Sequence, residues 1–191
     1  MVSIVVFTIG IVWVYLLLNA STTLSVRSKT SIIGANIIRE QLELIKNLRD
    51  TNFLRLNDWD SLKNTEHAAS LSKLETGFYT IENAFGAGNP TKIEKLTLTS
   101  ADTTSIKTDF KATPSKIRLC LDSRWRYTHE CSGNSPTPYA SFFEVSPATT
   151  KDNSNVNIPI EKAFILRAYF YSSDHENFIV SSSTLISDWK K

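Results

Sequence analysis

Residues 2–18, VSIVVFTIGIVWVYLLL, form an uncharged apolar stretch that decides the fold of this chain. As an α-helix, which rises 1.5 Å per residue, this stretch nearly crosses the hydrocarbon core of a bilayer, which takes about 20 apolar residues. The helical pattern then continues, because residues 20–50 contain no proline and only one glycine, Gly34. Apolar residues in this second part recur at helical spacing: Ile33, Ile37, Ile38, Leu42, Leu44, Ile45 and Leu48.

We therefore expect one helix from near Met1 to about Asn52, made of two parts. Residues 1–19 are apolar on every side and suit a membrane span or a filament core. Residues 20–53 are amphipathic, so one face can pack on a globular head and another on neighbouring subunits. Residues 54–191 are expected to form a β-rich head with one modest core.

The apolar N-terminus has three competing interpretations. A cleaved signal peptide has a basic segment before the apolar run, but none occurs here, and the run passes directly into more helix. A single membrane anchor needs only the apolar half and usually reaches its domain through a flexible linker, which this pattern lacks. A filament subunit, which packs many such helices into a bundle, uses both halves.

The sequence also resembles type IV pilins, minor pilins and secretion pseudopilins. Residues 1–11, MVSIVVFTIGI, are similar to the hydrophobic segment that follows the Phe-Thr-Leu-Ile-Glu-Val-like start of these proteins. Residues 37–53, IIREQLELIKNLRDTNF, resemble the end of the pilin helix in candidate-phyla and some Gram-positive bacteria. Residues 178–189, FIVSSSTLISDW, resemble the last strand and tail of those proteins. The resemblance covers the helix well and the middle of the head weakly.

The resemblance implies the pilin fold, an α+β architecture in which a long N-terminal helix packs on an antiparallel β-sheet head. It implies a structural subunit of a pilus-like surface filament, whose partners are copies of itself or other pilins and the inner-membrane assembly machinery. The residues expected in the membrane or filament core are Ile4, Val5, Phe7, Ile9, Gly10, Ile11, Val12, Trp13, Leu16 and Leu17. The residues expected between helix and sheet are Ile37, Ile38, Leu42, Leu44, Ile45 and Leu48.

Before assembly, such a subunit spans the cytoplasmic membrane once with its head outside the cell. The alternative function is a single-pass, membrane-anchored extracellular domain that binds a ligand or DNA and does not polymerise. The sequence does not separate major from minor pilins, nor motility, adhesion, DNA uptake and secretion.

Pilins are made with a short basic leader that ends in glycine, and an early glutamate pairs with a neighbour's N-terminal amine during assembly. In this sequence Met1 falls at about the sixth or seventh mature position, without the leader, the glycine or the glutamate. We therefore expect the full-length parent to carry these residues. Arg27 and Lys29 follow the apolar run, and by the positive-inside rule alone they would place the head in the cytoplasm. A basic leader would reverse that orientation.

Cys120 and Cys131 are the only cysteines of the chain and lie close together in the sequence. A disulfide that closes such a loop contributes on the order of 3 kcal/mol in an oxidising compartment. Two unrelated reduced thiols are the alternative, whereas zinc would need more ligands than these cysteines and His129 provide. The pair therefore favours a disulfide and a head outside the cell.

The head is predicted to be mostly β-strand. Strands are expected at residues 77–82, 93–99, 115–122, 139–145, 163–171 and 177–186. Turns are expected at residues 86–90 and 172–177, and a surface loop at 148–157. Residues 59–74 are ambiguous and are expected to hold a short helix starting near Asp58, with Trp59, Leu62, Leu71 and Leu74 packing inward.

The sequence carries no recognisable catalytic or cofactor motif, such as His-Glu-x-x-His, Gly-x-Ser-x-Gly, a Walker loop or Cys-x-x-Cys. His129 precedes Glu130 and Cys131, but a disulfide-bonded cysteine cannot act as a nucleophile. The carboxylates considered for a calcium loop lack its spacing: Asp58, Asp60 and Asp152. The histidines all lie in expected polar or loop segments: His67, His129 and His175. We expect no enzymatic activity, no cofactor and no metal.

One segment interleaves basic and aromatic residues, as surfaces that stack on single-stranded nucleic acid do. Its members are Lys116, Arg118, Arg124, Trp125, Arg126 and Tyr127. The alternative is a solvated strand edge, with Trp125 and Tyr127 covering the core beneath the cysteine loop. The net charge of +2 is too small to favour nucleic acid, so nucleic-acid binding is the less favoured hypothesis for this possible ligand patch.

Overall fold

The structure is a computed structural model that describes residues 2–63, 65–67, 71–83, 91–113, 115–151, 157–174 and 178–188. For residues 2–6 it describes the backbone alone, so the side chains of Ile4 and Val5 lie outside the described part. Asp152, His175 and the expected turn at 86–90 lie wholly outside the described part.

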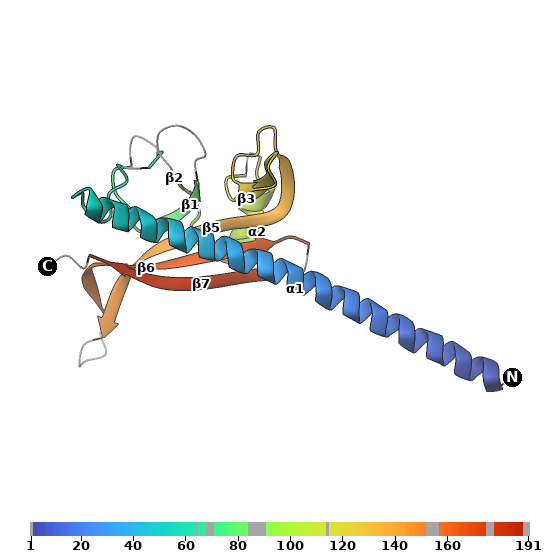
Figure 1. Cartoon of the computed structure of the whole chain (residues 1–191). Helices are drawn as coiled ribbons and strands as arrows, with labels where there is room; N and C mark the ends of the chain where they lie inside the picture. The colour runs from blue at the N-terminus through green and yellow to red at the C-terminus, as the bar shows by residue number, and fades with distance from the viewer. Residues whose placement is uncertain are drawn as a thin grey trace.

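A single helix of 53 residues, α1 (Val2–Leu54), dominates the molecule, and its N-terminal half projects beyond the head (Figure 1). The predicted long helix is thereby confirmed. Residues 7–29 are exposed, and Thr30 is the first buried residue that follows them. The expected packing residues of its second half are all buried against the sheet: Ile37, Ile38, Leu42, Leu44, Ile45 and Leu48.

The head is built on one antiparallel sheet, which contains 7 strands in the described part of the chain. They are β1 (Gly77–Asn83), β2 (Thr91–Lys95), β3 (Arg118–Leu121), β4 (Tyr127–Thr128), β5 (Ser135–Lys151), β6 (Asn157–Ser172) and β7 (Phe178–Ser187). The α+β architecture expected from the sequence is therefore present.

Strand β5 organises this sheet because both β1 and β3 pair with the same edge of it. β3 pairs near the start of β5, with Arg118 opposite Ala140, and β1 pairs further along, with Tyr79 opposite Phe143. The other edge of β5 carries β6, which in turn carries β7. The sheet is consequently forked between β1 and β3, and Figure 1 shows β5 curving away toward β3.

Alternating side chains of β5 supply two separate hydrophobic clusters. Phe143 and Val145 face α1, whereas Phe142 belongs to a second cluster on the opposite face. That face is covered by α2 (Thr103–Lys111), which buries Ile106 and Phe110. Helix α2 was not predicted from the sequence, although Asp102 is an N-cap residue that accepts hydrogen bonds from the backbone of Thr104 and Ser105.

Several boundaries differ from the sequence prediction. The short helix expected within residues 59–74 was wrong, because the described residues there form turns and isolated bridges. Leu62, Leu71 and Leu74 are nonetheless buried, and Trp59 packs against the ring of Phe164. Inward packing thus occurs without a helix, because backbone bonds between residues 60–62 and 72–74 hold the segment instead.

Two other segments also differ. Of the surface loop expected at 148–157, residues 148–151 belong to β5 and residue 157 to β6, with residues 149–151 paired to residues 157–159, and residues 152–156 lie outside the described part. The second strand begins and ends earlier than expected, at residues 91–95, and residues 96–99 continue without strand pairing. In the first place the polar composition, and in the second the alternation of apolar residues, was a weaker signal than the pairing partner that the fold supplies.

Candidate functional site

The exposed half of α1 is the first candidate site. Its large apolar side chains between Phe7 and Val26 are 45% to 70% exposed, on every side of the helix. This set includes Phe7, Ile9, Ile11, Val12, Trp13, Leu16 and Leu17. Gly10 lies among them, and a Cβ atom built on it would have no other atom within 4 Å. Among the described residues one helix, Phe7–Leu54, is long and apolar enough to cross a membrane. We call residues 7–29 the stem.

The stem joins the head without a linker, because the same helix continues into the core. At Gly34 the helix touches Phe170 of β6, and a Cβ built on this glycine would lie 2.5 Å from the phenylalanine ring. Further along, the amide of the buried Gln41 donates a 3.0 Å hydrogen bond to Ser141 Oγ of β5. The stem is therefore held in a fixed direction relative to the head.

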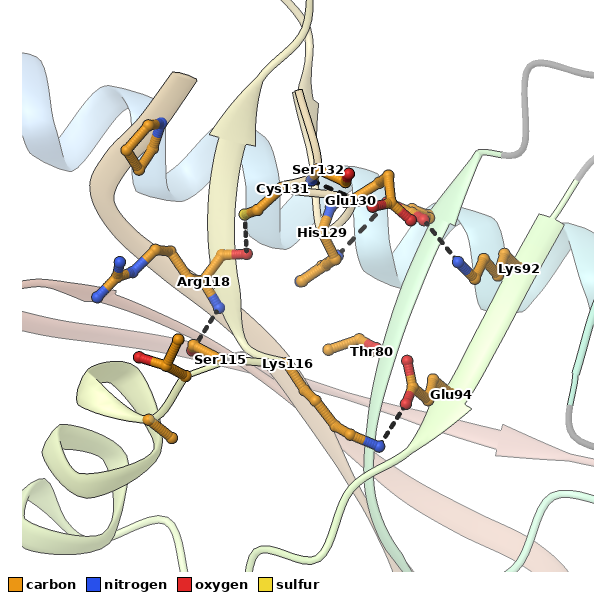
Figure 2. A pocket seen from close by; sticks show the side chains of 14 residues that line it. Thr80, Lys92, Glu94, Ser115, Lys116, Arg118, His129, Glu130, Cys131 and Ser132 are labelled. Carbon is orange, nitrogen blue, oxygen red and sulfur yellow. Dashed lines mark hydrogen bonds and ion pairs between the residues drawn. The ribbon is translucent and has the colours of Figure 1, made fainter. Parts of the chain in front are cut away.

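The fork of the sheet forms the second candidate site, a cleft of about 540 Å³ between β1 and β3 (Figure 2). Thr80 and Glu82 of β1, with Lys92 and Glu94 of β2, line one side. Lys116 and Arg118 lie on the other, and the segment at His129–Ser132 closes one end. The lining is rich in charge, and opposite charges face each other.

The charges of the cleft are largely paired, with Lys116 and Glu94 facing each other across it and Lys92 and Glu82 side by side on neighbouring strands. Lys116 Nζ lies 2.6 Å from Glu94 Oε1, and Lys92 Nζ lies 3.9 Å from Glu82 Oε1. Arg118 donates to the carbonyl of Phe110 at 2.7 Å and lies over the Phe110 ring, 4.4 Å from its centroid. The ion pairs are part-exposed, so each contributes little to stability, about 0–1 kcal/mol.

Glu82 is the most perturbed acid of the cleft. Burial opposes its ionisation, but the side chain of His129, the His129 backbone N–H and Thr128 Oγ1 outweigh this effect, the last two through hydrogen bonds that are each 2.8 Å long. His129 Nδ1, 3.7 Å from the same carboxylate oxygen, adds an electrostatic attraction when protonated. Together these contacts lower the pKa of Glu82 to about 2. Sequence reasoning missed Glu82, because its partners lie 46 and 47 residues further along the chain.

The basic and aromatic segment does not form one surface. Arg118 lies in the cleft, and Arg126 forms a two-bonded ion pair with Asp122 at 2.8 and 2.6 Å. Tyr127 is half-buried, edge-on to Tyr139. Lys116 is exposed but faces Glu94, whereas Arg124 and Trp125 are exposed at the turn after β3, and Trp125 is 80% exposed. The structure thus brings these two together and separates them from Arg118, while Lys116 faces Glu94 in the cleft.

The cysteines and the remaining polar candidates have clear structural partners. Cys120 and Cys131 form the expected disulfide. His67 Nδ1 lies 2.8 Å from the carbonyl of Thr65, and Asp58 and Asp60 both face Lys73, at 2.7 and 3.8 Å. Within the described ranges, no group of three or more potential metal ligands gathers.

Comparison of the chain with protein-family models, with curated proteins and with solved structures finds no match in any of the three.

Proposed function

We propose that the chain is a structural subunit of a type IV pilus-like filament that is drawn from a membrane. The stem is the observation that carries this proposal. Its apolar side chains are exposed all around the helix, so a single contact with one neighbour would leave most of them in water. Two environments cover such a helix on every side, the interior of a bilayer and a bundle of similar helices.

The length of the stem fits first a bilayer and then a bundle of similar helices. Residues 7–29 extend about 35 Å as a helix, close to the roughly 30 Å hydrocarbon core of a membrane. In a filament the stems of successive subunits would replace the lipid. Contacts between different faces of identical subunits are heterologous and do not close, so a fibre can grow.

The rigid connection between stem and head distinguishes a filament subunit from an ordinary anchored domain. Because α1 continues into the core without a linker, the position of each stem in a bundle would fix the position of its head. The contacts of Gly34 with Phe170 and of Gln41 with Ser141 support this fixed geometry. A tethered binding domain has no need of such stiffness.

The proposed location is the cytoplasmic membrane with the head outside, and then the cell surface. The disulfide between Cys120 and Cys131 supports an external head, because such bonds persist in oxidising compartments. The machinery that would extract the subunit from the membrane is a further partner in this proposal.

The test fuses the leader and first mature residues of a pilin to the chain and expresses the fusion with a pilus assembly system. We expect sheared fibres to contain the wild-type subunit and to lack the Leu16→Asp variant, because a charge in an apolar helix bundle is costly. Leu56→Asp is the matched control, since Leu56 is 83% exposed on the head. A wild-type protein that stays monomeric in the membrane while the machinery works would contradict the proposal.

The forked cleft favours a second candidate function, a membrane-anchored domain that binds a small ligand. Its volume of about 540 Å³ lies in the range of ligand pockets. Native mass spectrometry of the detergent-solubilised chain tests this function. A bound molecule that is lost in Lys116→Ala and kept in Lys63→Ala would support this second function. If neither the fibre-bound nor the membrane-bound protein carries a bound molecule, the result would count against this function.

A further inference from the structure

The turn between β3 and β4, residues 122–126, is a rigid structure that presents one aromatic side chain. The backbone N–H of Trp125 donates to Asp122 O at 3.0 Å, and that of Asp122 donates to Arg126 O, also at 3.0 Å. Asp122 Oδ1 accepts from the backbone N–H groups of Arg124 and Arg126, at 2.8 and 2.9 Å. The disulfide of Cys120 lies directly beside this turn and ties its base to Cys131.

Trp125 stands at the tip of this turn in an unfavourable state. Its side chain is 80% exposed, and its φ of 61° is in the left-handed region that bulky residues rarely adopt. Asparagine or glycine would adopt this positive φ at a lower conformational cost, and a polar side chain would be better solvated at this exposed position. Strain of this kind persists where the surrounding contacts enforce it, and it concentrates at binding sites.

A shallow depression of about 410 Å³ lies beside the indole. Its lining consists of Leu121, Asp122, Ser123, Trp125, Gly133, Asn134 and Ser135. Asn134 uses its amide nitrogen to donate to Glu130 O at 2.7 Å, which fixes the side chain and leaves its amide oxygen as an acceptor. The lining therefore combines an aromatic face with small, neutral hydrogen-bonding groups.

The depression also lacks unbalanced charge. Asp122 is the single ionisable residue among the described residues that line it, and both guanidinium bonds of Arg126 neutralise its carboxylate. Hydrogen bonds from the Arg126 backbone and side chain lower the pKa of Asp122, so the pair stays charged and matched at neutral pH. A charged ligand would find no free counter-charge in this lining.

We propose that Trp125 and this depression form a binding site for a neutral pyranose sugar of an oligosaccharide. A pyranose ring has one face of C–H groups, which packs on an aromatic ring, and a rim of hydroxyl groups, which suits amide, hydroxyl and backbone partners. The site matches both features. It does not depend on whether the chain polymerises, since the turn lies in the head and away from the stem.

A nucleic acid fits these observations less well. Single-stranded nucleic acid needs a basic groove along its backbone as well as an aromatic platform. Arg118 lies in the cleft over Phe110, and Arg126 is committed to Asp122, so Arg124 is the one exposed base beside Trp125. Binding of an oligothymidylate is accordingly an outcome that overturns the proposal.

The test uses the full chain in a sugar-free zwitterionic detergent and isothermal titration calorimetry. The probes are cellohexaose, maltohexaose, mannohexaose and chitohexaose, each titrated up to about 10 mM, with an oligothymidylate alongside. We expect at least one hexaose to bind, and its affinity to fall by at least about tenfold in Trp125→Asn, a residue that accepts a positive φ. Trp125→Phe, which keeps an aromatic face, should retain most of the binding.

The matched control is Leu56→Asn, because Leu56 is also 83% exposed and also has a positive φ, of 56°. This variant should bind the sugar as the wild type does. An intact disulfide by mass spectrometry and an unchanged melting temperature show that Trp125→Asn remains folded. The proposal is overturned if no hexaose binds, if binding survives Trp125→Asn, or if the oligothymidylate binds in its place.

Discussion

Gly34 of α1 and Phe170 of β6 are in direct contact at the point where the helix enters the head. A Cβ atom on residue 34 would lie 2.5 Å from Cδ1 of Phe170, and the phenylalanine is fully buried. The helix therefore approaches the sheet more closely here than any residue with a side chain would allow. Because Phe170 also packs on Tyr139, it has little room to yield.

This contact predicts that Gly34→Ala destabilises the protein. Alanine improves helix propensity by about 1 kcal/mol, but the clash with a fixed aromatic ring costs about 1–3 kcal/mol, so we expect a net loss. Thermal unfolding in detergent measures the effect. Gly10→Ala is the control, because no atom lies within 4 Å of its Cβ position. Equal or higher stability of Gly34→Ala would show that the helix shifts at no cost.

The packing of the amphipathic half predicts a large penalty for a buried charge. Ile45 is 2% exposed within the core between α1 and the sheet. Ile45→Asp should lower the free energy of unfolding by about 3–5 kcal/mol, because it buries an unpaired carboxylate. Ile32→Asp places the same charge on the same helix at a position that is 60% exposed. Denaturant unfolding of both variants should separate them clearly, and similar curves would refute the helix–sheet packing.

The perturbed Glu82 predicts a loss of stability in acid. Its folded pKa of about 2 lies below its ordinary value of 4.5, so its contribution is complete above about pH 4.5 and disappears as the pH falls toward 2. The contribution is up to about 3 kcal/mol. Glu82→Gln should remove this part of the pH dependence, and Glu161→Gln, at an exposed position, is the charge-matched control. The comparison requires melting temperatures at pH values across this window.

The disulfide predicts both a mass and a stability difference. Native protein analysed without reductant should weigh two hydrogens less than the reduced protein. Replacing Cys120 with alanine and Cys131 with serine should cost on the order of 3 kcal/mol, because the loop gains freedom in the unfolded state. Alkylation of both thiols in untreated, exported protein would reject the bond and weaken the argument for an external head.

Features that depend on local spacing could be predicted from the sequence. The uncharged run at residues 2–18 and the helical recurrence from Ile33 to Leu48 predicted one helix with an apolar first half and an amphipathic second half that packs on the sheet, and the structure contains this helix with its second half buried. The strand near residues 139–145 and the disulfide were also accessible, because alternation and a single cysteine pair leave few choices. These signals are local, so they survive without knowledge of the fold.

The partners on the two edges of β5 could not be predicted from the sequence, because strand pairing joins residues that are distant in the chain. The pairing of both β1 and β3 with one edge of β5 opens the cleft and brings Glu82 to His129 and Glu94 to Lys116. The same pairing carries Arg118 away from Trp125, although the two are close in sequence. The strained turn that exposes Trp125 likewise arises from contacts of Asp122 and Arg126, which composition does not reveal.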